Sequence, residues 1–237
     1  MKIICSKSNL VKGVNIVSKA VPSKTTMPIL QCILIDATTD IIKFTANDME
    51  LVIETVVDGS IARKGVVAID LAGDEAKFKT SNFDKLFDEI KKKNIPFTIH
   101  AGEADSYESV QTAISFGTKR IGHGVRCIEN NDTVKELVAR GISLEICPTS
   151  NVNTKVVTDL KYHPIKKLVD AGVLVTINTD NRTVSNTNLD KEYDLLRKEF
   201  NFNDDDFLQF NLNAIDCAFL SGEEKENLRN LLLDNWS

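Results

Sequence analysis

Residues 96–103 read Pro-Phe-Thr-Ile-His-Ala-Gly-Glu, and this stretch shows the pattern that decides the fold. A short apolar run ends in a histidine, and a glycine and a carboxylate follow at once. Such a run is typical of a buried strand in a parallel sheet. In parallel α/β folds, functional side chains lie just beyond the carboxyl ends of the strands. The stretch therefore predicts a buried strand with two chemically useful residues, His100 and Glu103, at its end.

The same pattern recurs through the second part of the chain. Apolar runs occupy residues 66–71, 96–100, 120–123, 143–147 and 173–178. Helical patterns separate them: one follows a cap at Ser81, one ends at Gly141, and one begins at Pro164. Further helices are predicted over 189–200, 204–219 and 221–233. This alternation is typical of parallel βα units. We therefore predict an α/β fold, a partial (β/α) TIM-type barrel with about five units where a closed barrel has eight.

Residues 1–66 follow a different pattern. After a short opening strand, apolar residues recur at helical spacing over 10–17, with a cap at Ser8 or Asn9 and an end at Pro22. Three runs rich in Ile, Val and Thr follow, over 29–36, 40–46 and 50–58. Their short connections favour an antiparallel meander. We predict a small βαβββ segment over 1–65 and a second domain over 66–237.

Charge and composition bound the partners. Residues 1–66 carry 8 Lys and Arg against 6 Asp and Glu, and residues 67–237 carry 21 against 28. A net charge of +2 over the first part offers little phosphate neutralisation, so we expect no DNA binding. No run approaches the ~20 apolar residues of a membrane helix, and no secretory leader is visible. Five scattered cysteines suit a reducing compartment. We expect a cytoplasmic protein with no membrane partner.

Polar residues follow all five predicted strands of the second part. A histidine and a carboxylate at neighbouring strand ends can ligate zinc, and His100 and Asp180 are such a pair. Glu103 can donate a proton to a reacting nitrogen, and His123 can hold a metal-bound water or take its proton. Gly73 has no side chain and lets a flat ring approach the backbone. The structural alternatives stay open, because a strand-end histidine can be an ordinary core residue and an acidic residue after a strand can form a turn.

Five motifs of the second part resemble, in order and spacing, those of the adenosine deaminase family. They are Val67-Ala-Ile-Asp-Leu-Ala-Gly-Asp-Glu75, Thr98-Ile-His-Ala-Gly-Glu103, Arg120-Ile-Gly-His-Gly124, Leu144-Glu-Ile-Cys-Pro148 with Ser150-Asn151, and Ile177-Asn-Thr-Asp180. The resemblance runs from about residue 66 to the end of the chain. It implies a zinc-dependent β/α barrel that adds water to C6 of adenosine, or of a related purine nucleoside, and releases ammonia.

The resemblance also implies a role for each matching residue. His100 and Asp180 match zinc ligands, and Glu103 matches the acid that protonates N1 of the purine. His123 matches the histidine that orients the zinc-bound water and helps to deprotonate it. Gly73 matches a backbone contact to the purine.

Two features depart from the family pattern. Asn181 stands where many members have a second aspartate that contacts the purine. The family's first barrel strand carries a His-x-His pair that supplies two further zinc ligands, and this sequence has no such pair among its three histidines. The third, His163, lies beside Pro164 and is expected to be a surface or capping residue. Zinc sites usually take three protein ligands plus water. We therefore expect weak zinc binding and little deamination.

Residues 1–66 resemble a second family. Met1-Lys-Ile-Ile-Cys-Ser-Lys7, Lys24-Thr-Thr-Met-Pro-Ile-Leu30 and Phe44-Thr-Ala-Asn-Asp-Met-Glu-Leu51 are similar to the amino terminus of the bacterial DNA polymerase III β subunit, the sliding clamp. The span is about half of the first of the clamp's three domains, so clamp function does not follow. Three interpretations stay open: an adenosine deaminase-like hydrolase, complete or impaired; a sliding clamp fragment; or a recombined chimera with neither activity. The open edges of a partial barrel also predict self-association.

Overall fold

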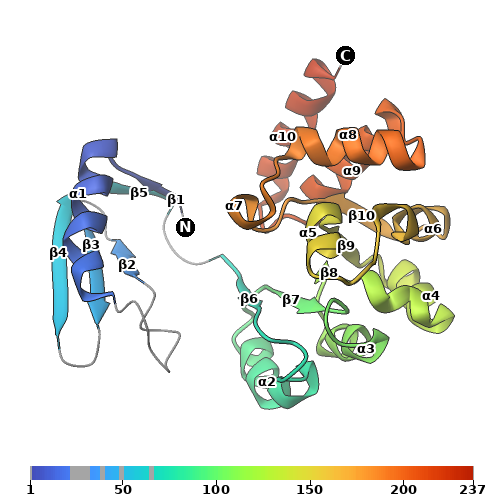
Figure 1. Cartoon of the computed structure of the whole chain (residues 1–237), viewed down its shortest axis with the longest axis horizontal. Helices are drawn as coiled ribbons and strands as arrows, with labels where there is room; N and C mark the ends of the chain where they lie inside the picture. Colours follow the sequence, from blue (N-terminus) through green and yellow to red (C-terminus); the bar gives the residue numbers. More distant parts are fainter. Residues whose placement is uncertain (1, 22–32, 38–40, 48–50, 64–66, 237) are drawn as a thin grey trace. The chain divides into compact units, whose positions relative to one another are not determined.

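The computed structural model describes residues 2–21, 33–37, 41–47, 51–63 and 67–236 (Figure 1). The chain divides into two compact units, Met1–Val67 and Ala68–Ser237. Each unit has its own hydrophobic core. Within the described ranges, no helix combines the length and the apolar character needed to cross a membrane.

The second unit is built on a five-stranded parallel sheet. Its strands are β6 (Ile69–Leu71), β7 (Phe97–Ala101), β8 (Arg120–His123), β9 (Ser143–Ile146) and β10 (Leu174–Ile177). The order across the sheet is β10-β9-β8-β7-β6, so strands that are neighbours in sequence are neighbours in space. All four pairings are parallel. The predicted class, a partial barrel of five βα units, is confirmed.

Helices follow the strands in chain order (Figure 1). They are α2 (Asp84–Lys92), α3 (Tyr107–Phe116), α4 (Asn131–Arg140), α5 (Pro148–Asn153), α6 (Ile165–Asp170), α7 (Arg182–Ser185), α8 (Leu189–Phe200), α9 (Asp204–Cys217) and α10 (Gly222–Asn235). Short 3₁₀ turns occupy η3 (Thr80–Phe83), η4 (Val125–Glu129) and η5 (Leu160–Tyr162).

Local signals located some helix ends and missed others. Gly141 ends α4 with a left-handed φ of 61°, as its sequence position predicts. Pro164 is the residue that precedes α6, also as predicted. The predicted cap at Ser81 is wrong, because Ser81 lies inside the 3₁₀ turn that comes before α2. The helix itself begins only at Asp84, after Phe83.

The core of the second unit joins the sheet to its helices. Ile99, Ile121 and Leu144, from three adjacent strands, have no exposed surface. Leu137 of α4 and Leu168 of α6 are equally buried in the same cluster. Burying such side chains stabilises a fold by roughly 1.5–3 kcal/mol each. This rigid sheet fixes the positions of its strand ends.

The outer edge of β10 is covered by a side chain. Asn178 donates its backbone N–H to the Ile146 carbonyl of β9, so Val175, an odd number of residues away, faces the opposite edge. The buried Asn213 of α9 donates from Nδ2 to the Val175 carbonyl at 2.9 Å. One acceptor that an incoming strand would use is therefore occupied, and self-association through the sheet edges stays a prediction.

The first unit contains two small antiparallel sheets. Its elements are β1 (Lys2–Ile4), α1 (Lys7–Val17), η1 (Ser18–Ala20), β2 (Leu34–Ala37), β3 (Ile41–Asn47), β4 (Val52–Asp58) and β5 (Ser60–Arg63). Strands β2, β3 and β4 form the predicted meander, and β1 pairs with β5. Strand β5 was not predicted. Its four residues follow the turn at Gly59, where the sequence pattern indicated only the end of a strand.

The helix of the first unit begins earlier than predicted. Ser6, not Ser8 or Asn9, is the N-cap, and its hydroxyl accepts a hydrogen bond from the Asn9 N–H at 3.1 Å. The helix ends at Val17, and the predicted stop at Pro22 lies outside the described residues. Gly13 lets α1 approach the sheet, since a Cβ there would lie 2.6 Å from the Phe44 ring.

We predict that Asn213→Ala destabilises the second unit by about 1–3 kcal/mol, because the buried Val175 carbonyl loses its donor. Urea unfolding followed by the fluorescence of Trp236, the chain's single tryptophan, measures this. The exposed Asn227 of α10 provides the control, and Asn227→Ala should change stability by less than about 0.5 kcal/mol. Equal stability of the two variants would show that the edge of β10 does not need Asn213.

Candidate active site

The parallel sheet brings predicted site residues together at the carboxyl ends of its strands. His100 lies near the end of β7 and His123 is the last residue of β8. The centroids of their rings are 5.2 Å apart. Glu103 follows β7, and its Oε2 lies 3.4 Å from Nε2 of His123. Asp180 follows β10, and its negative charge acts to raise the pKa of His123. Four residues from the ends of three strands therefore form one cluster.

His100 is held by two neighbouring strands. Its Nδ1 lies 3.1 Å from Oδ1 of Asp70 in β6. This hydrogen bond raises the pKa of His100 above its ordinary value, while burial acts in the opposite direction. On the other side, Gly122 of β8 packs closely against the ring, and a Cβ there would lie 3.0 Å from it, a tight contact. The side chain stays 29% exposed and can reach a ligand.

His123 lies deeper than His100. It is 2% exposed, and burial lowers its pKa, partly opposed by the charge of Glu103. Its Nδ1 lies 3.1 Å from Nδ2 of Asn151 in α5. Oε1 of Glu103 lies 3.1 Å from the Thr154 hydroxyl, whose single proton is shared with the Ser150 carbonyl at 2.9 Å. Both side chains therefore have fixed orientations.

A buried carboxylate, Glu75, fixes the loop that carries Glu103. It accepts hydrogen bonds from the backbone N–H groups of Gly102, Glu103 and Ala104 at 2.6, 3.0 and 2.7 Å. The Ser109 hydroxyl donates a fourth at 2.7 Å. Glu75 thereby ties the loop after β6 to the loop after β7. Sequence reasoning gave this residue no role, because its partners lie 27 or more residues away and leave no local signal.

The remaining predicted residues have other local partners. Oδ2 of Asp180 accepts a hydrogen bond from the Ser150 hydroxyl at 2.6 Å, and its backbone is left-handed with a φ of 53°. Asn181 caps α7, since its Oδ1 accepts from the Val184 N–H at 3.1 Å. The side-chain oxygen of Asn181 is therefore engaged in capping the helix.

His163 was expected to be a surface or capping residue. It does cap, because its Nδ1 accepts a hydrogen bond from the Ile165 N–H at 3.1 Å. It is not on the surface: only 3% of it is exposed. The η5 turn and α6 enclose it, and its Nε2 lies 3.2 Å from Oδ1 of Asn151.

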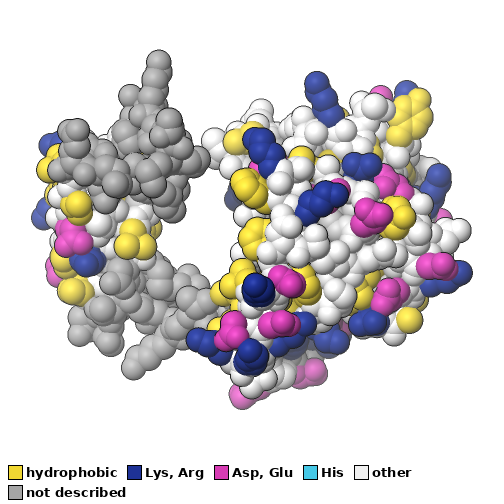
Figure 2. All heavy atoms as spheres, turned by 90° about the horizontal axis from the view of Figure 1, so that it is seen from below, with side chains coloured by type: hydrophobic (Ala, Val, Ile, Leu, Met, Phe, Trp, Pro, Cys, Tyr) yellow, Lys and Arg dark blue, Asp and Glu magenta, His cyan; other side chains and the backbone are white. Residues whose placement is uncertain are grey.

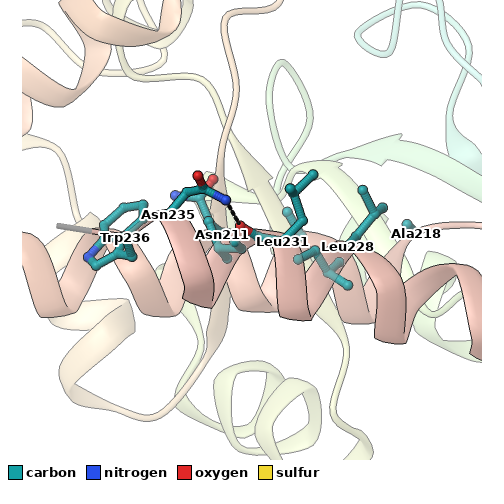
Figure 3. Close-up of a pocket in the computed structure, with 9 residues that line it drawn as sticks. Asn211, Ala218, Leu228, Leu231, Asn235 and Trp236 are labelled. Atoms are coloured by element: carbon teal, nitrogen blue, oxygen red, sulfur yellow. Dashed lines mark hydrogen bonds between the residues drawn. The ribbon is translucent and has the colours of Figure 1, made fainter.

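A cavity of about 210 Å³ opens beside His100. Its other lining residues are Leu71, Ala72, Gly73, Asp74, Glu75, Phe78, Thr80 and Phe83. Gly73 forms part of its wall, and a Cβ there would have no atom within 4 Å. A larger, apolar groove of about 570 Å³ lies between α9 and α10 and is lined by none of the predicted site residues (Figure 3). Two of the predicted site residues, Gly73 and His100, line the smaller cavity, and Glu103 lines a separate cavity of about 350 Å³.

The described donors do not complete a zinc site. Because a carboxylate only accepts, Asp70 leaves the Nε2 lone pair of neutral His100 free, which suits a metal ligand. Asp180 can supply an oxygen. Among the residues that the structure describes, however, no group of three His, Cys, Asp or Glu is placed to hold a metal ion. Zinc sites normally have at least three protein ligands, so this set is one short.

A family model and individual known proteins match this chain. The family model described as adenosine deaminase matches residues 6–235. An adenosine deaminase of Haemophilus ducreyi is 48% identical over 164 residues, which are 69% of this chain and 48% of that protein. One of Streptococcus agalactiae is 40% identical over 185 residues, 78% of this chain and 54% of that protein. The chain spans about half the length of the curated relatives it matches.

Solved structures also match parts of this chain. An adenine deaminase of Arthrobacter aurescens matches with a TM-score of 0.68 at 28% identity, covering 71% of this chain and 52% of that one. The N6-methyl-AMP deaminase of Arabidopsis thaliana matches with a TM-score of 0.65 at 29% identity, covering 72% and 50%. A putative DNA polymerase III β subunit of Eubacterium rectale is 68% identical over 27% of this chain and 17% of that one, with a TM-score of 0.25.

The three histidines should titrate differently from one another and from a free imidazole. By NMR, we expect His100 to titrate above its ordinary pKa of about 6.5 and His123 below it. Burial lowers the pKa of His163 to about 4. A titration of His163 near 6.5 would contradict the enclosed position described above.

The low pKa of His163 also makes stability depend on pH. The unfolded chain binds this proton below about pH 6.5, whereas the folded chain resists it down to about pH 4. The share of the free energy of unfolding that depends on neutral His163 is therefore fully present above pH 6.5. It is lost as the pH falls towards 4, and the total loss is about 3 kcal/mol. Urea unfolding between pH 4 and 7 should show this loss, and it should shrink in His163→Gln. An unchanged pH profile in that variant would exclude His163 as the cause.

Proposed function

This chain belongs to the adenosine deaminase family, and on that premise we propose that its second unit carries a deaminase-like hydrolase site for adenosine or a related purine nucleoside. The observation that supports the proposal most strongly is the strand-end cluster. It places two histidines 5.2 Å apart, sets a carboxylate 3.4 Å from one of them, and opens a cavity beside the other. Deamination of a purine needs these elements: a place for a flat ring, a proton donor for a ring nitrogen and groups that hold a water.

Each residue has a proposed role in that site. The purine would enter the cavity against the backbone of Gly73, where the missing side chain leaves room. Glu103 would hold the proton for N1, because Glu75 and Thr154 fix its loop and its Oε1 atom. His123 would orient the water, and Asn181 would contact the purine only through atoms that its cap leaves free.

The metal is the weak part of the site. Zinc, when bound in such enzymes, lowers the pKa of water and so supplies a nucleophile at neutral pH. His100 and Asp180 are the proposed ligands, and the described donors offer no third. We therefore propose an impaired enzyme that binds zinc weakly and deaminates near the background rate.

The first unit has a separate origin in this proposal. We interpret residues 1–65 as a sliding-clamp-like segment joined to the deaminase-like part. The division at residues 67 and 68 and the two separate cores support a chimera. On the face of the second unit seen in Figure 2, Lys and Arg alternate with Asp and Glu, which favours the proposal that DNA is not a partner. A cytoplasmic location remains part of the same proposal.

Turnover tests the impairment. The purified chain with adenosine and added zinc should release ammonia near background, and His100→Ala should behave alike. The Haemophilus ducreyi enzyme serves as the positive control. Robust turnover that is lost in His100→Ala would show that a third ligand is present and that the site is intact.

Ligand binding tests the site independently of turnover. Adenosine should shift the NMR signals of His100 in the unaltered chain. Gly73→Val should abolish that shift without unfolding the protein, because its side chain would enter open space in the cavity. Gly222→Ala, another glycine with nothing within 4 Å, is the matched control and should bind as the unaltered chain does. Binding that survives Gly73→Val would place the nucleoside elsewhere.

A further inference from the structure

We infer that His163 is a positioning residue that fixes the tautomer of His123 through Asn151, so that neutral His123 presents an N–H, not a lone pair, to the site. The inference rests on the proposed function, because it narrows what His123 does there. It depends on three buried side chains whose hydrogen bonds form one directed series.

The series starts at a backbone amide. The Ile165 N–H, at the first residue of α6, donates to Nδ1 of His163 at 3.1 Å. A backbone amide can only donate, so Nδ1 carries no proton. The neutral His163 ring therefore has its proton on Nε2. Burial, which lowers the pKa of His163 to about 4, keeps the ring neutral at physiological pH.

Asn151 passes this direction on. The Nε2–H of His163 needs an acceptor, and the atom 3.2 Å away is Oδ1 of Asn151. The amide orientation is thereby determined by its partners. Its Nδ2 faces Nδ1 of His123 at 3.1 Å, and an amide nitrogen only donates. Nδ1 of His123 must then be the acceptor, and its proton lies on Nε2.

Burial enforces the series. His163, Asn151 and His123 are 3%, 0% and 2% exposed. An alternative arrangement would leave a donor facing a donor in the interior, which costs about 1–3 kcal/mol per unsatisfied group. A single backbone amide on α6 therefore sets the protonation of a ring two side chains away.

The two histidines of the site consequently differ. Neutral His100 carries its proton on Nδ1, because the Asp70 carboxylate there can only accept a hydrogen bond. It therefore offers a lone pair at Nε2. His123 offers an N–H at Nε2, an atom that lies 3.4 Å from Oε2 of Glu103. In the proposed site His123 thus holds a water or a developing oxyanion by donating a hydrogen bond. It cannot take a proton at Nε2 while it is neutral.

Ring ¹⁵N NMR of the full chain, without metal and above the titration range of the three rings, reads the tautomers directly. We expect the proton on Nε2 of His163 and His123 and on Nδ1 of His100. A proton on Nδ1 of His123, or a mixture of its two tautomers, would overturn the inference. The readout needs neither zinc nor turnover, so an inactive chain tests it as well as an active one, and the ammonia assay does not report on it.

Asn151→Asp provides the sharpest variant. A carboxylate accepts from both neighbours, so a proton should appear on Nδ1 of His123 while His163 and His100 keep their tautomers. Asn153→Asp adds the same charge at an exposed position of α5 and should change none of them. If Nδ1 of His123 still carried no proton in Asn151→Asp, the series of hydrogen bonds would be contradicted.

A second variant covers the case in which Asn151→Asp does not fold. His163→Phe keeps an aromatic ring but removes the anchor, so that the Asn151 amide can turn over. His123 should then show both tautomers. If His163 had a purely structural role, His123 would keep its proton on Nε2 in this variant.

Discussion

The parallel pairing of β6 to β10 is the constraint on which the site depends. Parallel strands present their carboxyl ends at one edge, so residues as distant in sequence as His100 and Asp180 can act together. The strands alone would not fix the conformation of the loops that follow them. The main contact that does so is made by Glu75, because this one buried carboxylate accepts hydrogen bonds from three consecutive amides of the loop that carries Glu103.

Within this frame, neighbouring groups decide what each histidine can do. Asp70 makes His100 an electron-pair donor at Nε2, and the series from His163 makes His123 a hydrogen-bond donor. Two identical side chains 5.2 Å apart therefore have complementary chemistry. A deaminase-like site needs both kinds of group. What the described residues lack is a third donor for a metal ion, and this shortfall separates the retained geometry from the proposed loss of activity.

Much of the second unit could be predicted from sequence because its signals are local. The run at 120–123 coincides with β8, and Gly141 ends its helix, since an apolar run or a left-handed glycine acts where it stands. Caps were harder, because Ser6 and Ser8 are equally suited and only the backbone geometry chooses between them. The role of Glu75, and the buried position of His163 with its contact to Asn151, were missed because they come from contacts made across the fold.

Native mass spectrometry of the full chain with stoichiometric zinc tests the central claim most directly, namely that the cluster is retained but its metal donors are incomplete. We predict mainly metal-free protein, with a small zinc-bound fraction that disappears in His100→Ala. A single zinc ion bound by nearly every molecule at equimolar concentration, and lost in that variant, would contradict the account.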